Sequence, residues 1–324
     1  MVKLFTVKAF FKNELTRLFL FVVTCLIIAA IFSPYFYTWG TEIGNGEGAE
    51  WLGSVKRSLR RADLARYFNR VMMLSAVILL YPFIKSLKDT NVTEVKAPLS
   101  VRINPRKQGW KDLLMGFVFA TGYMGIFFMV VFKLGWIELD VDASPSRAIT
   151  KAITPAITVS LIEEWLFRGV LFSLLLRSLS PRKTVIGLSF FFALVHFLKP
   201  YHGSPEIADP GAWNAGFILL GQIGEKFIHP EDFFGVFLTL FLVGVILAYA
   251  RHKTGYLWMS IGLHAGWVFA LKIYSALTNN TEKAEPVFYG SDIREGIVPM
   301  LFVLLTGLSV VMYLRSNQPL QKTK

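Results

Sequence analysis

Charged residues are scarce in this sequence, and cysteine is almost absent. Only 17% of the 324 residues are Asp, Glu, Lys or Arg, whereas 54% are hydrophobic. A soluble globular domain carries about 25% charged and 45–50% apolar residues. This deficit of charge, together with a mean hydropathy of +0.50, indicates that lipid rather than water is the main solvent. The single cysteine, Cys25, excludes an internal disulfide.

Other absences exclude whole classes of function. The sequence contains no zinc-knuckle spacing, Walker loop or dinucleotide-binding fingerprint. The net charge of +12 does not indicate nucleic acid, because the basic residues fall in short clusters between apolar segments. The positive-inside rule predicts such clusters in a membrane protein. We therefore expect the lipid bilayer as a partner, and no nucleic acid.

Eight apolar stretches approach the roughly 20 residues that a membrane span needs. They are 18–37, 71–86, 112–136, 148–176, 184–199, 233–250, 255–277 and 296–314. The stretch 211–228 contains polar residues and four glycines, and it predicts a re-entrant or interfacial segment. The predicted fold class is an all-α, polytopic transmembrane helix bundle of about eight spans. We divide it into N-terminal spans in 1–111 and a transmembrane core in 112–324.

Basic and acidic connections alternate along the chain, and this alternation predicts that both termini are cytoplasmic. Basic clusters lie in 85–111, 177–183, 251–253 and 315–324, and acidic ones in 138–142, 206–232 and 282–295. The connection between the first two spans disagrees, because it would place six basic residues outside. These are Lys56, Arg57, Arg60, Arg61, Arg66 and Arg70. Their helical spacing predicts a basic amphipathic helix that lies on the membrane surface.

The fourth expected span contains three charged residues, Glu163, Glu164 and Arg168. Together they oppose insertion by roughly 8–10 kcal/mol, against about 3–6 kcal/mol gained from the apolar neighbours. This span must therefore be shielded by other helices or face a hydrated cavity. Glu164 and Arg168 are four residues apart, so they can simply neutralise each other. Glu163 points about 100° away and is by default a functional candidate.

Histidines occur in two other expected spans, as His196 and His264. Either one alone is slightly better interpreted as a hydrogen-bonded core residue. At 1.5 Å per residue, however, Glu163, His196 and His264 lie about 21, 20 and 17 Å from the basic cluster that marks the cytoplasmic side of each span. Three spans thus place an acid or an imidazole in one layer.

One glutamate and two histidines suit the activation of water. A desolvated carboxylate can act as a general base near neutral pH. Imidazoles can orient the water, donate to a developing oxyanion or bind zinc. Glutamate with two histidines is also a known catalytic zinc set, so Glu163, His196 and His264 are the candidate ligands if a metal is present. The residues alone leave the presence of a metal open.

The same residues resemble the CPBP family of intramembrane endopeptidases, which includes the type II CAAX prenyl proteases and bacterial relatives. The family pattern is Glu-Glu-x-x-x-Arg, then Phe-x-x-x-His, then His-x-x-x-Asn, on separate transmembrane helices. Here the first is Glu163-Glu164 with Arg168, and the second is Phe192 with His196. The resemblance covers residues 148–277, and it implies an integral protein of a bacterial inner membrane.

By this resemblance, Glu163 activates the attacking water with help from His196, and His264 stabilises the oxyanion. The sequence departs from the pattern at its last position, where Val268 replaces the asparagine. Valine cannot donate a hydrogen bond, and loss of one oxyanion donor typically costs about 10²–10³ in rate. Either a neighbour such as the Trp267 indole substitutes, or the activity is reduced or altered.

The predicted function is therefore an intramembrane endopeptidase that hydrolyses peptide bonds of membrane-associated proteins or peptides. Glu163, His196 and His264 are its catalytic residues, with Glu164, Arg168 and Trp267 in support. Two alternatives stay open. A non-catalytic membrane factor on the same fold is favoured by Val268. A proton-coupled transporter also places Glu and His within spans, but the sequence lacks the repeated halves and paired broken helices of such folds.

Overall fold

The computed structural model describes residues 14–46, 53–88, 107–177, 179–198, 205–229, 233–283 and 296–316. Its elements are helices apart from one pair of very short strands, so the all-α membrane fold class is confirmed. The chain forms two compact units. The first combines Met1–Val95 with His196–Asp232, and the second combines Lys96–Val195 with Phe233–Lys324.

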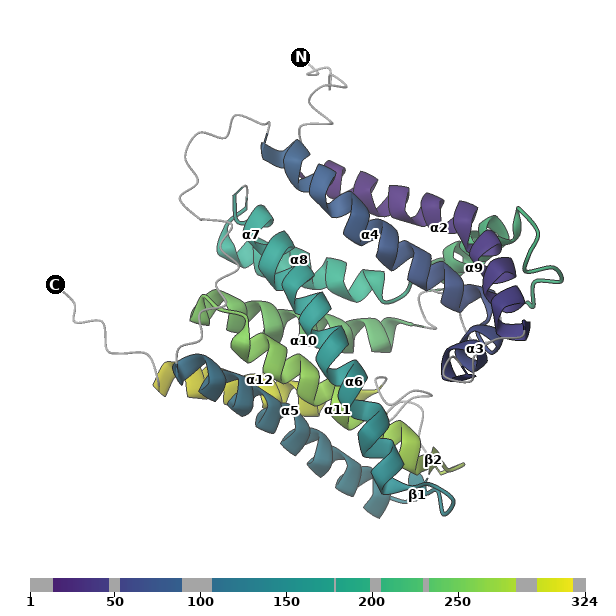
Figure 1. The fold of residues 1–324 in the computed structure, drawn as a ribbon. Helices are drawn as coiled ribbons and strands as arrows, with labels where there is room; N and C mark the ends of the chain where they lie inside the picture. The colour runs from purple at the N-terminus through teal and green to yellow at the C-terminus, as the bar shows by residue number, and fades with distance from the viewer. Residues whose placement is uncertain are drawn as a thin grey trace. The chain divides into compact units, whose positions relative to one another are not determined.

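The first unit is built on the paired helices α2 (Glu14–Asn45) and α4 (Leu64–Lys88), which lie side by side (Figure 1). The short helix α3 (Gly53–Arg60) connects them, and α9 (Ala215–Lys226) packs against both. Their shared core contains Ala29, Ala30, Phe68, Val71, Leu219 and Ile223. With twelve residues, α9 is only about 18 Å long and cannot cross a bilayer core of about 30 Å. This length fits the re-entrant or interfacial segment expected in 211–228.

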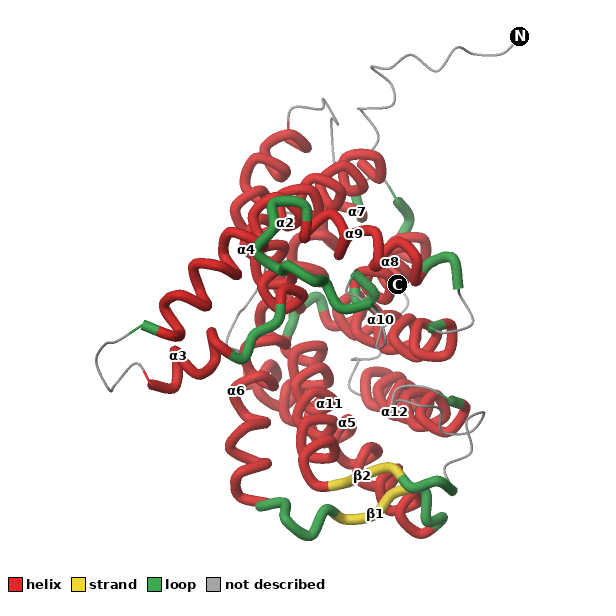
Figure 2. Tube along the Cα trace, turned by 90° about the vertical axis from the view of Figure 1, so that its right-hand side faces the viewer, coloured by secondary structure: helices red, strands yellow, loops and turns green. Residues whose placement is uncertain are grey.

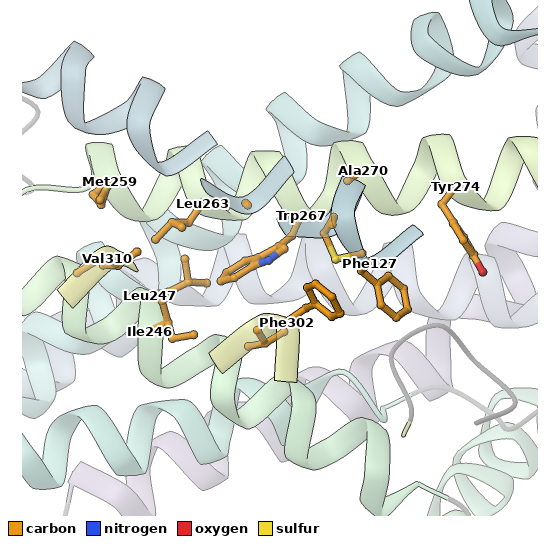
Figure 3. Close-up of a cluster of buried hydrophobic side chains, with 14 of the residues drawn as sticks. Phe127, Ile246, Leu247, Met259, Leu263, Trp267, Ala270, Tyr274, Phe302 and Val310 are labelled. Carbon is orange, nitrogen blue, oxygen red and sulfur yellow. The ribbon is translucent and has the colours of Figure 1, made fainter. Parts of the chain in front are cut away.

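The second unit carries the remaining helices. They are α5 (Lys107–Lys133), α6 (Pro145–Glu164), the π-helical turn η2 (Trp165–Leu171), α7 (Phe172–Leu175), α8 (Pro181–Val195), α10 (Phe234–Thr254), α11 (Trp258–Leu277) and α12 (Ile297–Ser316). Helix α11 packs against α5 and α6, and α10 packs against α8 and α12. Figure 3 shows the buried cluster that joins α5, α10, α11 and α12, with Phe127, Leu247, Leu263, Trp267 and Phe302 among its side chains.

Close packing of α11 on α5 depends on two glycines of α11. A Cβ atom on Gly262 would collide with the carbonyl oxygen of Leu113, and one on Gly266 would lie 2.7 Å from the Cβ of Ala120. The spacing Gly-x-x-x-Gly is typical of membrane helices whose backbones approach closely. His264 lies between these two glycines, so the backbone that carries it is held firmly against α5.

The sequence did not predict the two-stranded antiparallel pair that the structure contains. Strand β1 (Ile137–Leu139) follows α5, and β2 (Thr278–Asn280) follows α11, with Ile137 opposite Asn280 (Figure 2). Strands of three residues are too short for an alternating pattern to be recognised in a sequence. The pair ties the ends of α5 and α11 together.

Five described helices are long and apolar enough to cross a membrane, so the expected count of eight spans is not confirmed. These five are Thr16–Asn45, Leu64–Phe83, Gln108–Lys133, Phe234–Thr254 and Ile297–Ser316. The other three expected spans correspond to α6 with its continuation, to α8 and to α11. Helix α8 has only 15 residues, and polar side chains interrupt the apolar character of α6 and α11. Those polar side chains include the candidate site residues.

Candidate functional site

The two adjacent glutamates lie at the end of α6, where the helix changes its geometry. Ser144 caps the start of α6, because its hydroxyl accepts the backbone N–H of Arg147. Glu163 and Glu164 are the last two residues of the helix, and the wider η2 turn follows directly. Single π-helical turns inside α-helices frequently occur at functional sites. The local backbone thus singles out the same segment as the charged residues do.

Glu164 and Arg168 form the intrahelical ion pair that their spacing predicts. Nη1 of Arg168 lies 2.7 Å from Oε1 of Glu164, and both side chains are 0% exposed. The Arg168 guanidinium also lies over the ring of Phe192 on α8, 4.3 Å from the ring centroid. A charge buried this deeply is tolerated only with a partner, so each member of the pair depends on the other.

His264 reaches both glutamates from α11. Its Nδ1 lies 2.8 Å from Oε1 of Glu164, and its Nε2 lies 3.8 Å from Oε2 of Glu163. Because an ionised carboxylate only accepts hydrogen bonds, Nδ1 of His264 carries the proton in the bond to Glu164. The imidazole is thus fixed by Glu164 on one side and presents Nε2 toward Glu163 on the other.

The two glutamates therefore occupy different environments although they are neighbours in sequence. The side chain of Glu164 is 0% exposed, whereas that of Glu163 is 25% exposed. Glu164 is enclosed by Arg168 and His264, whereas part of the Glu163 side chain is exposed although its Oε2, which faces His264, is buried. Phe192 supports this arrangement, since its buried ring meets the His264 ring edge to face at 6.1 Å between centroids.

The sequence did not identify the bond between Glu164 and His264. Glu164 was assigned only to Arg168, four residues further along the same helix, whereas His264 is 100 residues away. Spacing reveals contacts within one helix, but it gives no information about contacts between helices. The only available signal was the similar depth of the ionisable residues in their spans.

The remaining predicted site residues lie as follows. His196 directly follows α8 and is half-buried, and its expected approach to Glu163 stays a prediction. Val268 is half-buried and lies one helical turn beyond His264. The Trp267 ring is buried in the apolar cluster of α5, α10, α11 and α12 (Figure 3). Its role as a substitute oxyanion donor also stays a prediction.

A metal site needs at least three protein ligands in a catalytic zinc centre. Within the described ranges, no three His, Cys, Asp or Glu side chains form a group that could hold a metal ion. Glu163 and His264 by themselves supply two donor atoms, 3.8 Å apart. The described residues therefore do not fit a complete zinc set, and we derive the chemistry of the site from its side chains.

Comparison with known proteins gives one match. Residues 145–270 match the family described as type II CAAX prenyl endopeptidase Rce1-like. This region contains α6, η2, α7, α8, α9, α10 and most of α11, and so it includes every predicted site residue. No curated protein and no solved structure matches the chain.

The buried pair generates a prediction about stability. Removing the Arg168 guanidinium leaves the Glu164 carboxylate without its cation in a site that excludes water, which typically costs about 3–5 kcal/mol. We expect Arg168→Met to lower the melting temperature and the yield of folded protein in detergent. Arg147→Met, at an exposed position of α6, is the matched control and should change little.

A second variant separates lost charge compensation from lost packing. If compensation is the cause, Glu164→Gln combined with Arg168→Met should recover most of the stability, because no isolated charge then stays buried. A double variant that is as unstable as Arg168→Met would contradict this account.

Proposed function

We propose that this chain, whose residues 145–270 match the type II CAAX prenyl endopeptidase Rce1-like family, hydrolyses peptide bonds of membrane-associated substrates with water activated by Glu163. The observation that carries the proposal is the position of His264 between two glutamates of different exposure. A carboxylate open to water beside a fixed imidazole provides a base and a hydrogen-bond donor in one place. Five described helices are long and apolar enough to cross a membrane, and they support an integral membrane protein as the setting of this chemistry.

In the proposed reaction, Glu163 removes a proton from a water molecule as the water oxygen attacks the scissile carbonyl carbon. The carbonyl oxygen becomes an oxyanion in the tetrahedral intermediate. When the intermediate collapses, the C–N bond breaks and the leaving amine takes the proton that Glu163 had accepted. Glu163 returns to the carboxylate form. The resemblance assigns His196 as the partner that orients Glu163 or the water.

His264 stabilises the oxyanion in this mechanism. To donate from Nε2 it must carry a proton on each ring nitrogen, and Glu164 supports that state by accepting the Nδ1 proton at 2.8 Å. Arg168 in turn holds Glu164 in place at 2.7 Å. The four groups then carry two negative and two positive charges. This balance suits a site with little access to water, where an unpaired charge is costly.

Zinc is an alternative that the residue types leave open. The described residues do not form a complete zinc set, so His196 would have to join Glu163 and His264 as the third ligand, and the metal would then supply Lewis-acid chemistry at the scissile carbonyl. Loss of cleavage upon chelation, followed by recovery upon addition of zinc, would favour this alternative over the mechanism above.

A non-catalytic membrane factor is the second candidate function, and Val268 is the observation that favours it. The residue is half-buried one turn beyond His264, where the family has an asparagine. In this alternative the buried charged network holds α6 and α11 together and has no role in hydrolysis.

The central prediction concerns Glu163. Glu163→Gln keeps the shape of the side chain but removes the general base, and we expect cleavage to fall by about 10²–10⁴-fold. The measurement compares the peptide fragments of membrane proteins in cells that express the wild type or the variant. It is followed by cleavage of any identified substrate by purified protein in liposomes.

Glu138→Gln is the matched control, because it makes the same change at an exposed position of β1. It should leave both cleavage and melting temperature unchanged. If Glu163→Gln reduces the amount of folded protein as strongly as it reduces cleavage, the motif is structural and the non-catalytic function is the better assignment.

A further prediction concerns the missing oxyanion donor. Val268→Asn places an amide one turn beyond His264, and we expect the rate to rise by up to about 10²-fold if the amide reaches the oxyanion. If the Trp267 indole already donates, Val268→Asn changes little, while Trp267→Phe slows cleavage. Turnover of the same substrate by both variants distinguishes these outcomes. If neither variant changes turnover, His264 does not belong to an oxyanion hole.

A further inference from the structure

An exposed cluster of arginines lies at one end of the first unit, far along the chain from the candidate site. Between Gly53 and Arg70 the sequence has six basic residues and a single acidic one, Asp63. The Lys56 ammonium donates to the backbone carbonyl of Gly46. The side chains of the other five basic residues are exposed, and we call them the arginine surface: Arg57, Arg60, Arg61, Arg66 and Arg70.

No ion pair between described residues neutralises the arginine surface. Among the residues that the structure describes, none of its five members pairs with an acidic side chain. The carboxylate of Asp63, in the same segment, accepts the backbone N–H of Arg66 at the start of α4. Arg70 lies near the ring of Tyr67, 5.8 Å from its centroid. Five guanidinium groups are therefore available to an external anion.

Exposed aromatic residues mark the depth of this surface relative to a bilayer. Trp39 and Tyr35 on α2 are each 59% exposed, and such residues gather at the level of the lipid headgroups. The neighbour of Trp39, Gly40, lies directly against the hydroxyl of Tyr67 on α4. Tyr67 is adjacent to Arg66, so the aromatic level of α2 coincides with the first arginines of α4.

From Tyr67 toward its C-terminal end, α4 exposes apolar side chains. Its next exposed side chains are Met73, Leu74, Val77 and Ile78, and they belong to a helix long and apolar enough to cross a membrane. The arginine surface thus begins where the apolar exposure ends. That depth is where lipid phosphates lie, and guanidinium groups bind phosphates through paired N–H donors.

From this position and charge we propose that the arginine surface binds anionic lipid headgroups. A cluster of four to eight Lys or Arg beside a membrane helix has the composition that attracts anionic lipid. This binding also explains the basic connection between the first two expected spans, which does not follow the alternation of basic and acidic connections along the chain. Its charges are held at the bilayer surface by lipid phosphates.

The test uses the purified full chain in phosphatidylcholine vesicles that contain a small amount of spin-labelled phosphatidylglycerol or spin-labelled phosphatidylcholine. Electron spin resonance measures the fraction of each labelled lipid that the protein immobilises. We expect the wild type to prefer phosphatidylglycerol, and we expect Arg57→Gln, Arg60→Gln and Arg61→Gln together to remove most of that preference. Neutralising two exposed basic residues of α6 with Arg147→Gln and Lys151→Gln is the control.

An unchanged preference in the triple variant overturns the proposal, as does an equal loss in the control. A second experiment compares inorganic phosphate with sodium chloride, each added at the same ionic strength. If phosphate abolishes the preference and chloride does not, the surface recognises the phosphate group of the lipid, and if the wild type shows no preference for phosphatidylglycerol, the lipid assignment is wrong. None of these outcomes depends on whether the protein cleaves peptides.

A different observation in the second unit concerns Arg251, which no motif includes. The N–H of Phe172 bonds the carbonyl of Phe167, five residues back. In an α-helix this N–H would bond the carbonyl of Arg168 instead. Because the η2 turn changes back to an α-helix here, the carbonyl of Arg168 does not accept the N–H of Phe172. Nε of Arg251 donates to this oxygen at 3.1 Å from the last turn of α10.

The position of Arg251 is itself fixed. Its own carbonyl accepts the N–H of Gly255, which ends α10 in the left-handed conformation at φ 73°. Arg168 is therefore held twice, through its side chain by Glu164 and through its backbone by Arg251. Since Glu164 also positions His264, the bond from Arg251 acts on the candidate site through the backbone of η2.

We infer that Arg251 is a positioning residue, which fixes the η2 turn so that Arg168 and Glu164 hold His264 in its reactive position. This inference rests on the proposed peptidase function. We expect Arg251→Met to lower kcat about tenfold or more and to leave KM unchanged, because small displacements of catalytic groups slow the chemical step. Arg251→Lys retains a donor for the carbonyl and should keep most of the activity.

Lys253→Met is the matched control, since it removes the same charge from an exposed position in the same turn. Hydrogen exchange of the backbone amides in 165–173 gives a second readout that needs no substrate. It should accelerate in Arg251→Met and not in Lys253→Met. If the wild-type protein cleaves nothing while hydrogen exchange behaves as expected, the proposed function is wrong. The inference that Arg251 fixes the η2 turn is then still supported.

Equal kcat values for Arg251→Met and Lys253→Met overturn the positioning role, and so does unchanged exchange. If Arg251→Lys and Arg251→Met lower the melting temperature and kcat in parallel, Arg251 only stabilises the fold.

Discussion

The buried carboxylate of Glu164 is the group on which the arrangement of the second unit depends. One of its oxygens accepts hydrogen bonds from Arg168 at 2.7 Å and from His264 at 2.8 Å. Removing a carboxylate from water is costly unless cations and donors replace the lost hydration. Helix α6 cannot bury Glu164 by itself, because Arg168 supplies only one of the two donors. It needs α11, and α11 can approach α5 closely because Gly262 and Gly266 lack side chains.

This constraint also separates the functions of two adjacent glutamates. Successive residues of an α-helix are rotated by about 100° around its axis. This rotation directs Glu164 inward and leaves Glu163 at the edge. The side chain of Glu163 is 25% exposed and that of Glu164 is 0% exposed. In the proposed mechanism, Glu164 therefore serves as a permanent counter-charge. Glu163, the more exposed of the two, is the carboxylate that exchanges protons with water in this mechanism.

Much of the fold follows from hydrophobicity, and the site follows only in part. Long apolar runs predicted the five helices that can cross a membrane, because composition and length suffice for that inference. The count of eight is not confirmed, since α6 and α11 contain the polar residues of the site and α8 is short. The ion pair of Glu164 and Arg168 could be predicted from its four-residue spacing. The bond from Glu164 to His264 was not, because contact between helices depends on packing that no local pattern records.

The same network bears on how an apolar residue can occupy position 268. A neutral amide and a charged imidazolium differ in strength as donors, and hydrogen bonds that involve an ionised group are roughly twice as strong as neutral ones. In the proposed mechanism, Glu164 and Arg168 keep His264 oriented, so no free energy is lost in turning the ring as the oxyanion forms. A site whose charged donor is already fixed in this way loses less from the absence of a second, neutral donor. In the proposed mechanism, the direct contact between Glu164 and His264 thus explains how a site with Val268 can still stabilise the oxyanion.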